Sequence, residues 1–151
     1  GGGAVRATRF GRIKDYATRC EEELCLLVQA ETQGALDRLE EIAHVDGVDG
    51  VFFGPADLAA DLGFPGQPGH PKVRKAIEAG ITQIRACGKA CGVLALDREV
   101  AVQYISLGCS FVAIGVDVVL LARSCERTLY DFRAELENAS TPKTAPQKLI
   151  P

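Results

Sequence analysis

The sequence predicts an α/β fold in which parallel strands alternate with helices, and three observations predict it. Four short apolar runs recur along the chain, at residues 24–29 (LCLLVQ), 51–54 (VFFG), 92–96 (GVLAL) and 111–115 (FVAIG). These runs do not alternate apolar with polar residues, which is typical of strands that are buried on both faces of a parallel sheet. Segments with the period of a helix separate them, so the expected order is α-(βα)4.

Each expected helix has a sequence signal of its own. Residues 10–22 precede the first run, and residues 34–45 follow it. Residues 71–88 begin with Pro71, which suits a helix start, and end with Gly88, which suits a helix stop. Residues 97–107 supply a further helix, and a long last helix begins near residue 121. The apolar residues that share one helical face in three of these segments are Leu36, Leu39, Ile42 and Ala43; Val73, Ile77, Ile81 and Ile84; and Leu121, Cys125, Leu129, Phe132 and Leu136.

The composition limits the class of protein. The chain has 151 residues, 47% of them hydrophobic, enough for one domain with a core. Its net charge of −3 comes from interspersed acids and bases, which argues against the basic patch of a nucleic-acid-binding protein. It contains no apolar run of roughly 20 residues and no signal peptide, so we expect no membrane contact and a soluble cytoplasmic domain. We expect that domain to span residues 1–137, followed by a polar, Pro-rich tail at residues 138–151.

The six cysteines are expected to be reduced core thiols. Cys25, Cys91 and Cys109 lie in or next to the apolar runs, where cysteine behaves as a small hydrophobic residue. The closest pairs along the chain lack the two-residue spacing and the accompanying histidine of a typical zinc site. A structural zinc ion or a disulfide is therefore disfavoured.

Two acids follow the first two expected strands. Glu31 lies just beyond the first strand, in QAET, and Asp57 lies just beyond the second, in GPADL. Ligands of parallel α/β folds bind beyond the carboxyl ends of the strands, so we expect both carboxylates at that edge and close together. Two facing carboxylates repel each other, and a shared Mg²⁺ or Mn²⁺ ion would relieve that repulsion. Alternatively, both acids are ordinary residues of helix N-termini.

Longer motifs resemble a known family. VDGVDGVFFGPADLAADLGFPGQPGHP, LVQAET, GKACGVLAL and GCSFVAIGVDVVLL resemble the HpcH/HpaI aldolases, the 4-hydroxy-2-oxoheptanedioate aldolase family of class II pyruvate aldolases. AVRATRFGRIKDY resembles the segment that leads into the fifth strand of that barrel, and the likeness runs from about residue 4 to about residue 133. It implies the C-terminal half of a (β/α)8 TIM-type barrel, for which the whole fold needs around 250 residues.

The resemblance also implies roles for particular residues. Glu31 and Asp57 match the two metal-binding carboxylates, with Mg²⁺ or Mn²⁺ as the expected cofactor and Co²⁺ as a further candidate. Gln29 matches a polar residue beside bound pyruvate, and the backbone N–H groups of Ala56 and Asp57 match those that approach the pyruvate carboxylate. Leu94 matches a position that lines the pocket for the aldehyde. The implied reaction is metal-dependent cleavage of 4-hydroxy-2-oxo acids, such as 4-hydroxy-2-oxoheptanedioate, to pyruvate and an aldehyde.

No Schiff-base lysine is required by this chemistry, and Lys89 precedes its strand and so lies at the wrong end of the sheet. The family's histidine base and its arginine clamp belong to the other half of the barrel. His44 is expected at the end opposite the site and His70 in a surface loop. Arginines 6, 9 and 12 precede the first strand and are expected on a solvated or intersubunit surface.

The implied partners are a small 2-oxo acid, an aldehyde, and either further copies of the chain or a complementing N-terminal half. The isolated chain is expected to be weakly active or inactive. Two alternatives remain: a non-catalytic half-barrel that serves binding or assembly, and a flavodoxin-like domain with a metal for phosphoryl chemistry. The latter lacks an acidic cluster after its first strand and a phosphate-binding glycine loop.

The chain contains no methionine and begins with Gly-Gly-Gly, which is not expected at a natural start of translation. A truncated gene product, a processed chain or a deliberately made half-barrel would each account for this.

Overall fold

The computed structural model describes residues 3–140. The chain divides into two units, one that ends at Ile114 and one that begins at Gly115. The elements are α1 (Tyr16–Arg19), η1 (Cys20–Glu23), β1 (Leu27–Ala30), α2 (Gln33–Leu36), α3 (Leu39–Ala43), β2 (Gly50–Phe53), α4 (Pro55–Asp61), α5 (Pro71–Ala86), β3 (Ala90–Leu94), α6 (Arg98–Ser106), β4 (Phe111–Ala113) and α7 (Asp117–Ser140).

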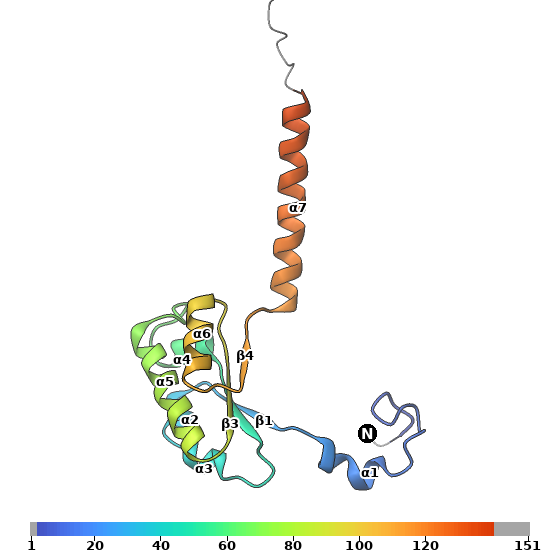
Figure 1. The fold of residues 1–151 in the computed structure, drawn as a ribbon, viewed down its shortest axis with the longest axis vertical. Coiled ribbons are helices and arrows are strands. Elements are labelled where there is room, and N and C mark those ends of the chain that lie inside the picture. Colours follow the sequence, from blue (N-terminus) through green and yellow to red (C-terminus); the bar gives the residue numbers. More distant parts are fainter. Residues whose placement is uncertain (1–2, 141–151) are drawn as a thin grey trace, which may run out of the picture. The chain divides into compact units, whose positions relative to one another are not determined.

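The four strands form one sheet in the order β1-β2-β3-β4, and every neighbouring pair is parallel. Figure 1 shows α5 and α6, together with α2, α3 and α4, on one side of this sheet. The expected fold class, with four parallel strands that alternate with helices, is confirmed.

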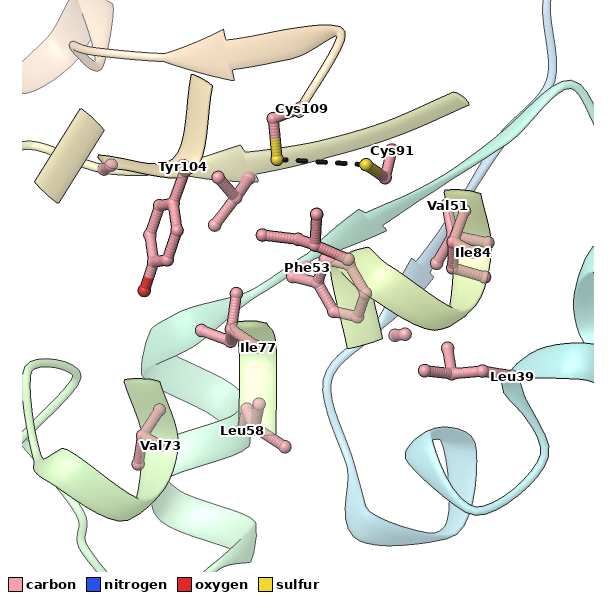
Figure 2. Packing of buried hydrophobic residues seen from close by; sticks show 14 of the residues in the cluster. Leu39, Val51, Phe53, Leu58, Val73, Ile77, Ile84, Cys91, Tyr104 and Cys109 are labelled. Carbon is pink, nitrogen blue, oxygen red and sulfur yellow. Dashed lines mark hydrogen bonds between the residues drawn. The ribbon is translucent and has the colours of Figure 1, made fainter. Parts of the chain in front are cut away.

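The core lies between the sheet and the helices. Val51 and Phe53 of β2 and Val93 of β3 are fully buried, as are Ile77 and Ile81 of α5. Figure 2 shows the Phe53 ring in the middle of this cluster. The apolar stripe that predicted α5 is therefore the stripe that packs against the sheet.

The opposite face of the sheet differs from the expectation that the strands are buried on both faces. Leu27 is 40% exposed and Phe111 is 53% exposed, while Phe52 and Leu94 are half-buried. Alternate residues of a strand point to opposite faces, and within residues 3–114 the layer of helices packs on one of these faces. The rings of Phe52 and Phe111 lie 5.7 Å apart and give this open face an aromatic pair.

The predicted and observed boundaries differ in several elements: β3 spans residues 90–94 rather than 92–96, and β4 ends at Ala113 rather than at residue 115. β1 begins at Leu27 rather than at residue 24, because Leu24 and Leu26 lie before the ladder and are exposed. The predicted helix at residues 34–45 is split into α2 and α3 by the non-helical backbone of Arg38 (φ −121°, ψ 23°). The predicted helix at residues 10–22 is reduced to α1 and η1, preceded by left-handed backbone at Arg9 and Phe10.

The helices α5 and α6 agree with their predictions. Pro71 is the first residue of α5, and Gly88, with a φ of 73°, follows its end. Asp97 caps α6 by accepting a hydrogen bond from the N–H of Val100 (3.0 Å).

Helix α7 contains the predicted stripe of the last helix, and Leu121, Leu129 and Phe132 of that stripe are exposed. The helix reaches Ser140, so residues 138–140 of the expected tail are helical, and residues 141–151 lie outside the described residues. Within residues 3–140, no helix has both the length and the apolar character required to cross a bilayer.

The six cysteines are free thiols in the described part of the chain, but Cys25 and Cys125 are exposed, so the expectation of core thiols is wrong for these two. Cys91 and Cys109 are buried with their sulfur atoms 3.9 Å apart (Figure 2). Burial raises the pKa of the Cys109 thiol to about 12, and the neighbouring Cys91 adds to that shift.

The raised pKa of Cys109 predicts a loss of stability at alkaline pH. In the unfolded chain this thiol ionises near its ordinary value of 9.0, whereas in the folded protein it stays protonated up to about 12. The unfolded state therefore binds fewer protons in this range, and the free energy of unfolding should fall from about pH 9 upward by roughly 1 kcal/mol per pH unit. Denaturant unfolding at a series of pH values in a reducing buffer measures this.

Cys109→Ala should flatten the alkaline slope, and Cys125→Ala, which changes an exposed thiol of α7, should leave it unchanged. The raised pKa of Tyr104 contributes a remaining slope in the same direction. Equal slopes for the wild-type chain and Cys109→Ala would contradict the assignment.

Candidate active site

The pairing of β1 with β2 determines where the two predicted metal ligands lie. Ala30, the last residue of β1, pairs with Phe53, the last residue of β2, and the N–H of Gly54 donates to the carbonyl oxygen of Ala30 (3.4 Å). Glu31 follows Ala30 directly, and Asp57 lies in the first turn of α4, four residues after Phe53. Both acids therefore lie beyond the carboxyl ends of adjacent parallel strands.

The carboxylate of Glu31 rests against the backbone of Gly54. A Cβ atom at Gly54 would lie 2.5 Å from Oε2 of Glu31 and 3.2 Å from its Cβ. A side chain at this position would push the carboxylate away, so the glycine leaves the space that the carboxylate fills. The side-chain amide of Gln29 donates to the same Oε2 atom over 3.4 Å.

Glu31 does not cap the helix that follows it. Thr32 is the N-cap of α2, and its hydroxyl accepts a hydrogen bond from the N–H of Ala35 (3.1 Å). Asp57 is exposed in the first turn of α4, where the helix dipole favours an acid. Asp57 thus fits the alternative role of an acid at a helix N-terminus. Glu31 does not act as an N-cap, because Thr32 occupies that position.

A third acid holds the two loops together. Asp61, the last residue of α4, accepts a hydrogen bond from the backbone N–H of Gln33 (2.7 Å). This contact links the end of α4 to the start of α2, two residues after Glu31. Sequence reasoning missed Asp61 because the short helix α4 has no complete apolar stripe.

The first turn of α4 offers backbone donors. Pro55 has no N–H group, and the first hydrogen bond of the helix runs from the N–H of Leu58 to the carbonyl oxygen of Gly54 (3.0 Å). The N–H groups of Ala56 and Asp57 precede this bond and so have no acceptor inside the helix.

A cleft of about 500 Å³ opens beside this turn. Leu94 and Ala56, both predicted to contact substrate, line it. The other lining residues are Pro55, Pro68, Gly69, Arg74, Ala95, Leu96, Asp97, Val100 and Tyr104. Gln29, Glu31 and Asp57 do not line the cleft, but Asp57 directly follows the lining residue Ala56, and Glu31 contacts Gly54, which precedes the lining residue Pro55.

Two residues of the cleft were missed in the sequence. Arg74 lies near the start of α5, and Tyr104 lies on α6 with only 2% of its surface exposed. Burial raises the pKa of Tyr104, and the charge of Arg74 opposes this rise. Arg74 could have been identified from its position, because it lies one turn inside a helix that begins at the same edge of the sheet as Glu31 and Asp57.

The two histidines are occupied elsewhere. His44 follows the last residue of α3 and precedes β2, and its Nδ1 lies 2.7 Å from the carbonyl oxygen of Glu40. His70 caps α5, where its Nδ1 accepts from the N–H of Lys72 (3.3 Å), and its ring stacks on Phe64 with centroids 3.7 Å apart. Among residues 3–140, no three side chains of the types His, Cys, Asp and Glu gather as a metal site would require.

Comparison with known proteins identifies a family, two relatives and a solved structure that resemble this chain. Residues 4–124 match the model of the HpcH/HpaI aldolase/citrate lyase family. A pyruvate aldolase of Rhizobium etli is 60% identical over 122 residues, which are 81% of this chain and 48% of that protein. A 4-hydroxy-2-oxo-heptane-1,7-dioate aldolase of Salmonella paratyphi B is 51% identical over 135 residues, which are 89% of this chain and 51% of that protein.

A crystal structure of an HpcH/HpaI aldolase/citrate lyase family protein from Burkholderia cenocepacia superposes with a TM-score of 0.76 at 36% identity. The superposition covers 88% of this chain and 52% of that protein. The chain thus spans about half the length of the relatives that it matches. With the parallel sheet, the site motifs and these matches in agreement, the chain belongs to the HpcH/HpaI aldolase/citrate lyase family.

Proposed function

We propose that this chain carries the metal-binding half of the active site of a class II pyruvate aldolase. The reaction would cleave 4-hydroxy-2-oxo acids, such as 4-hydroxy-2-oxoheptanedioate, to pyruvate and an aldehyde in the cytoplasm. The observation that carries the proposal is the Glu31 carboxylate, which lies against Gly54 at the entrance to the turn that bears Asp57. Relatives named as aldolases at 51–60% identity support it.

The residues present fit a divalent cation. Glu31 and Asp57 offer carboxylate oxygens, the donors that Mg²⁺ and Mn²⁺ prefer, and Co²⁺ is a third candidate. The space above Gly54, which a Cβ would fill, holds one of these carboxylates. Two protein ligands leave room in the coordination shell for water and substrate oxygens, as is usual for Mg²⁺. When bound, such an ion supplies Lewis acidity toward the oxygen atoms of a 2-oxo acid.

The other residues would bind and orient the substrate. Gln29, whose amide reaches Glu31, would lie beside the 2-oxo acid and keep the carboxylate in place. The N–H groups of Ala56 and Asp57 would donate to the carboxylate of pyruvate, since they have no acceptor inside α4. Leu94, at the end of β3, would form an apolar wall for the aldehyde.

The cleavage also needs groups that this chain would receive from a partner. As the bond between C3 and C4 breaks, the C4 hydroxyl loses its proton and becomes the aldehyde carbonyl, while C3 of the pyruvate product gains a proton. We propose that an N-terminal half-barrel provides the base and the arginine that binds the pyruvate carboxylate. The half-exposed open face of the sheet, with Leu27, Phe52 and Phe111, would be covered by that half or by another copy of this chain.

The same open face favours a second candidate function. A half-barrel with exposed apolar side chains on its sheet would also suit a non-catalytic module that assembles with another chain. Metal binding at Glu31 and Asp57 separates the two functions, because an assembly module needs none.

Metal binding predicts a thermal shift. Mg²⁺ or Mn²⁺ at ten times its Kd should stabilise the chain by roughly 1.4 kcal/mol and raise the melting temperature by several degrees. Asp57→Ala should abolish the shift because it removes one of two protein ligands. Asp46→Ala, in an exposed turn before β2, is the control and should keep the whole shift. Equal shifts in the wild-type chain and in Asp57→Ala would show that the ion binds elsewhere.

A glycine pair tests the role of Glu31 without altering an acid. Gly54→Ala would displace the Glu31 carboxylate and should weaken the metal-induced shift. Gly34→Ala adds the same methyl group in α2, where nothing lies within 4 Å, and should leave the shift intact. The pair compares the same chemical change at and away from the site.

Activity should depend on an N-terminal half-barrel. A positioned base contributes about 10²–10⁴-fold to a rate, and orientation by a carboxylate clamp adds to this. The chain alone should therefore cleave 4-hydroxy-2-oxoheptanedioate several orders of magnitude more slowly than a mixture with a separately produced N-terminal half. Release of pyruvate, coupled to a dehydrogenase, measures both rates. Full activity in a monomeric preparation of the chain alone would contradict the account.

A further inference from the structure

The cleft beside α4 contains a cation without a carboxylate partner. Arg74 lies on α5 one turn after its N-cap, and its backbone N–H donates to the carbonyl oxygen of His70 (3.0 Å). Its guanidinium donates from Nη2 to Oε1 of Gln103 (2.5 Å), a neutral amide of α6. Within the described residues, Arg74 forms no ion pair with an acid.

The nearby acids are engaged with other donors. Oε1 of Glu78 accepts from Nε2 of Gln103 (3.0 Å), and Oδ1 of Asp97 accepts from the N–H of Val100 (3.0 Å). Gln103 therefore bridges Arg74 and Glu78 without neutralising the cation, and Asp97 is directed into its helix cap. The charge of Arg74 remains available to a ligand in the cleft.

Tyr104 adds a neutral donor next to this cation. Burial raises its pKa, against the opposing charge of Arg74, so its hydroxyl is protonated at neutral pH. Figure 2 shows the ring at the border of the core, with its hydroxyl directed away from Cys91 and Cys109. Arg74 and Tyr104 both line the cleft, so a single polar group of a ligand can contact both side chains.

The rest of the cleft is largely apolar. Leu94, Leu96 and Val100 line it together with Pro55 and Pro68. A volume of about 500 Å³ with such walls suits a short aliphatic chain. An aliphatic chain that ends in a carboxylate would place its methylene groups on these walls and its charge at Arg74.

We propose that Arg74 is a specificity-determining residue that binds a terminal carboxylate on the aldehyde half of the substrate. This rests on the proposed aldolase function, because Leu94 lines the aldehyde pocket only if that function is right. The preferred substrates are then dianionic 4-hydroxy-2-oxo acids: one carboxylate lies at the end that becomes pyruvate, and the other lies at Arg74. Neutral aldehydes of the same length leave the guanidinium without an anion.

The test uses two ligands that differ in charge and hardly in shape, butanoate and butanamide, with binding to the whole chain followed by ¹H–¹⁵N NMR titration. Butanoate should shift the amide signals around Leu94 and Tyr104 and bind about threefold to tenfold more tightly than butanamide. The preference should shrink at high salt, since the cleft is open to solvent.

Arg74→Gln should remove the preference, Arg74→Lys should retain part of it, and Lys75→Gln, on the same helix outside the cleft, should leave it unchanged. Melting temperatures show that each variant is folded. No preference in the wild-type chain, no binding of either ligand, or a preference that survives Arg74→Gln would overturn the proposal.

The metal-induced thermal shift, measured on the same samples, reports on the proposed function separately. A shift that persists in Arg74→Gln together with a lost preference is the expected pair of results. If Arg74→Gln loses the preference for butanoate but the wild-type chain shows no metal-induced shift, Arg74 binds an anion in the cleft. The assignment of that anion as part of an aldolase substrate would then be overturned.

Discussion

The register between β1 and β2 is the constraint on which the candidate site depends. Because Ala30 pairs with Phe53, the residues that follow them, Glu31 and Gly54, lie side by side. The absence of a Cβ at Gly54 lets the Glu31 carboxylate reach the backbone that leads into α4. A shift of one residue would turn Glu31 to the other face of the sheet and remove it from this contact.

Within residues 3–114, the core maintains this register from the helix-covered face of the sheet. Phe53, the last residue of β2, is buried under α5, which approaches so closely that a Cβ at Gly80 would lie 2.7 Å from its ring. At the other end of the strands, the N–H of Leu26 donates to Asp49 (2.6 Å) and the Lys89 ammonium donates to the carbonyl oxygen of Val48 (2.6 Å). The helix-covered face is thus a packed core, whereas the open face keeps its apolar side chains partly exposed. This asymmetry agrees with a chain that spans about half of its relatives.

Much of the fold could be predicted because its signals are local. Pro71, Gly88 and the stripe from Val73 to Ile84 define α5 without reference to the rest of the chain. The break near Arg38 and the left-handed backbone at Arg9 and Phe10 could not be predicted, because apolar spacing continues through both. At the site, strand ends pointed to Glu31 and Asp57, since position in a parallel sheet follows from chain order. The cleft could not be predicted, because Arg74 and Tyr104 meet across two helices that are separated by β3.

The central claim is that Glu31 and Asp57 together bind one divalent ion, and Mn²⁺ tests it most directly. Because Mn²⁺ is paramagnetic, it broadens the NMR signals of nearby amides, so a titration of the ¹⁵N-labelled chain locates the ion. The account predicts selective broadening around Glu31, Gly54 and Asp57, which Glu31→Gln abolishes and Mg²⁺ in excess reverses. Broadening centred on other acids, or unchanged by Glu31→Gln, would contradict it.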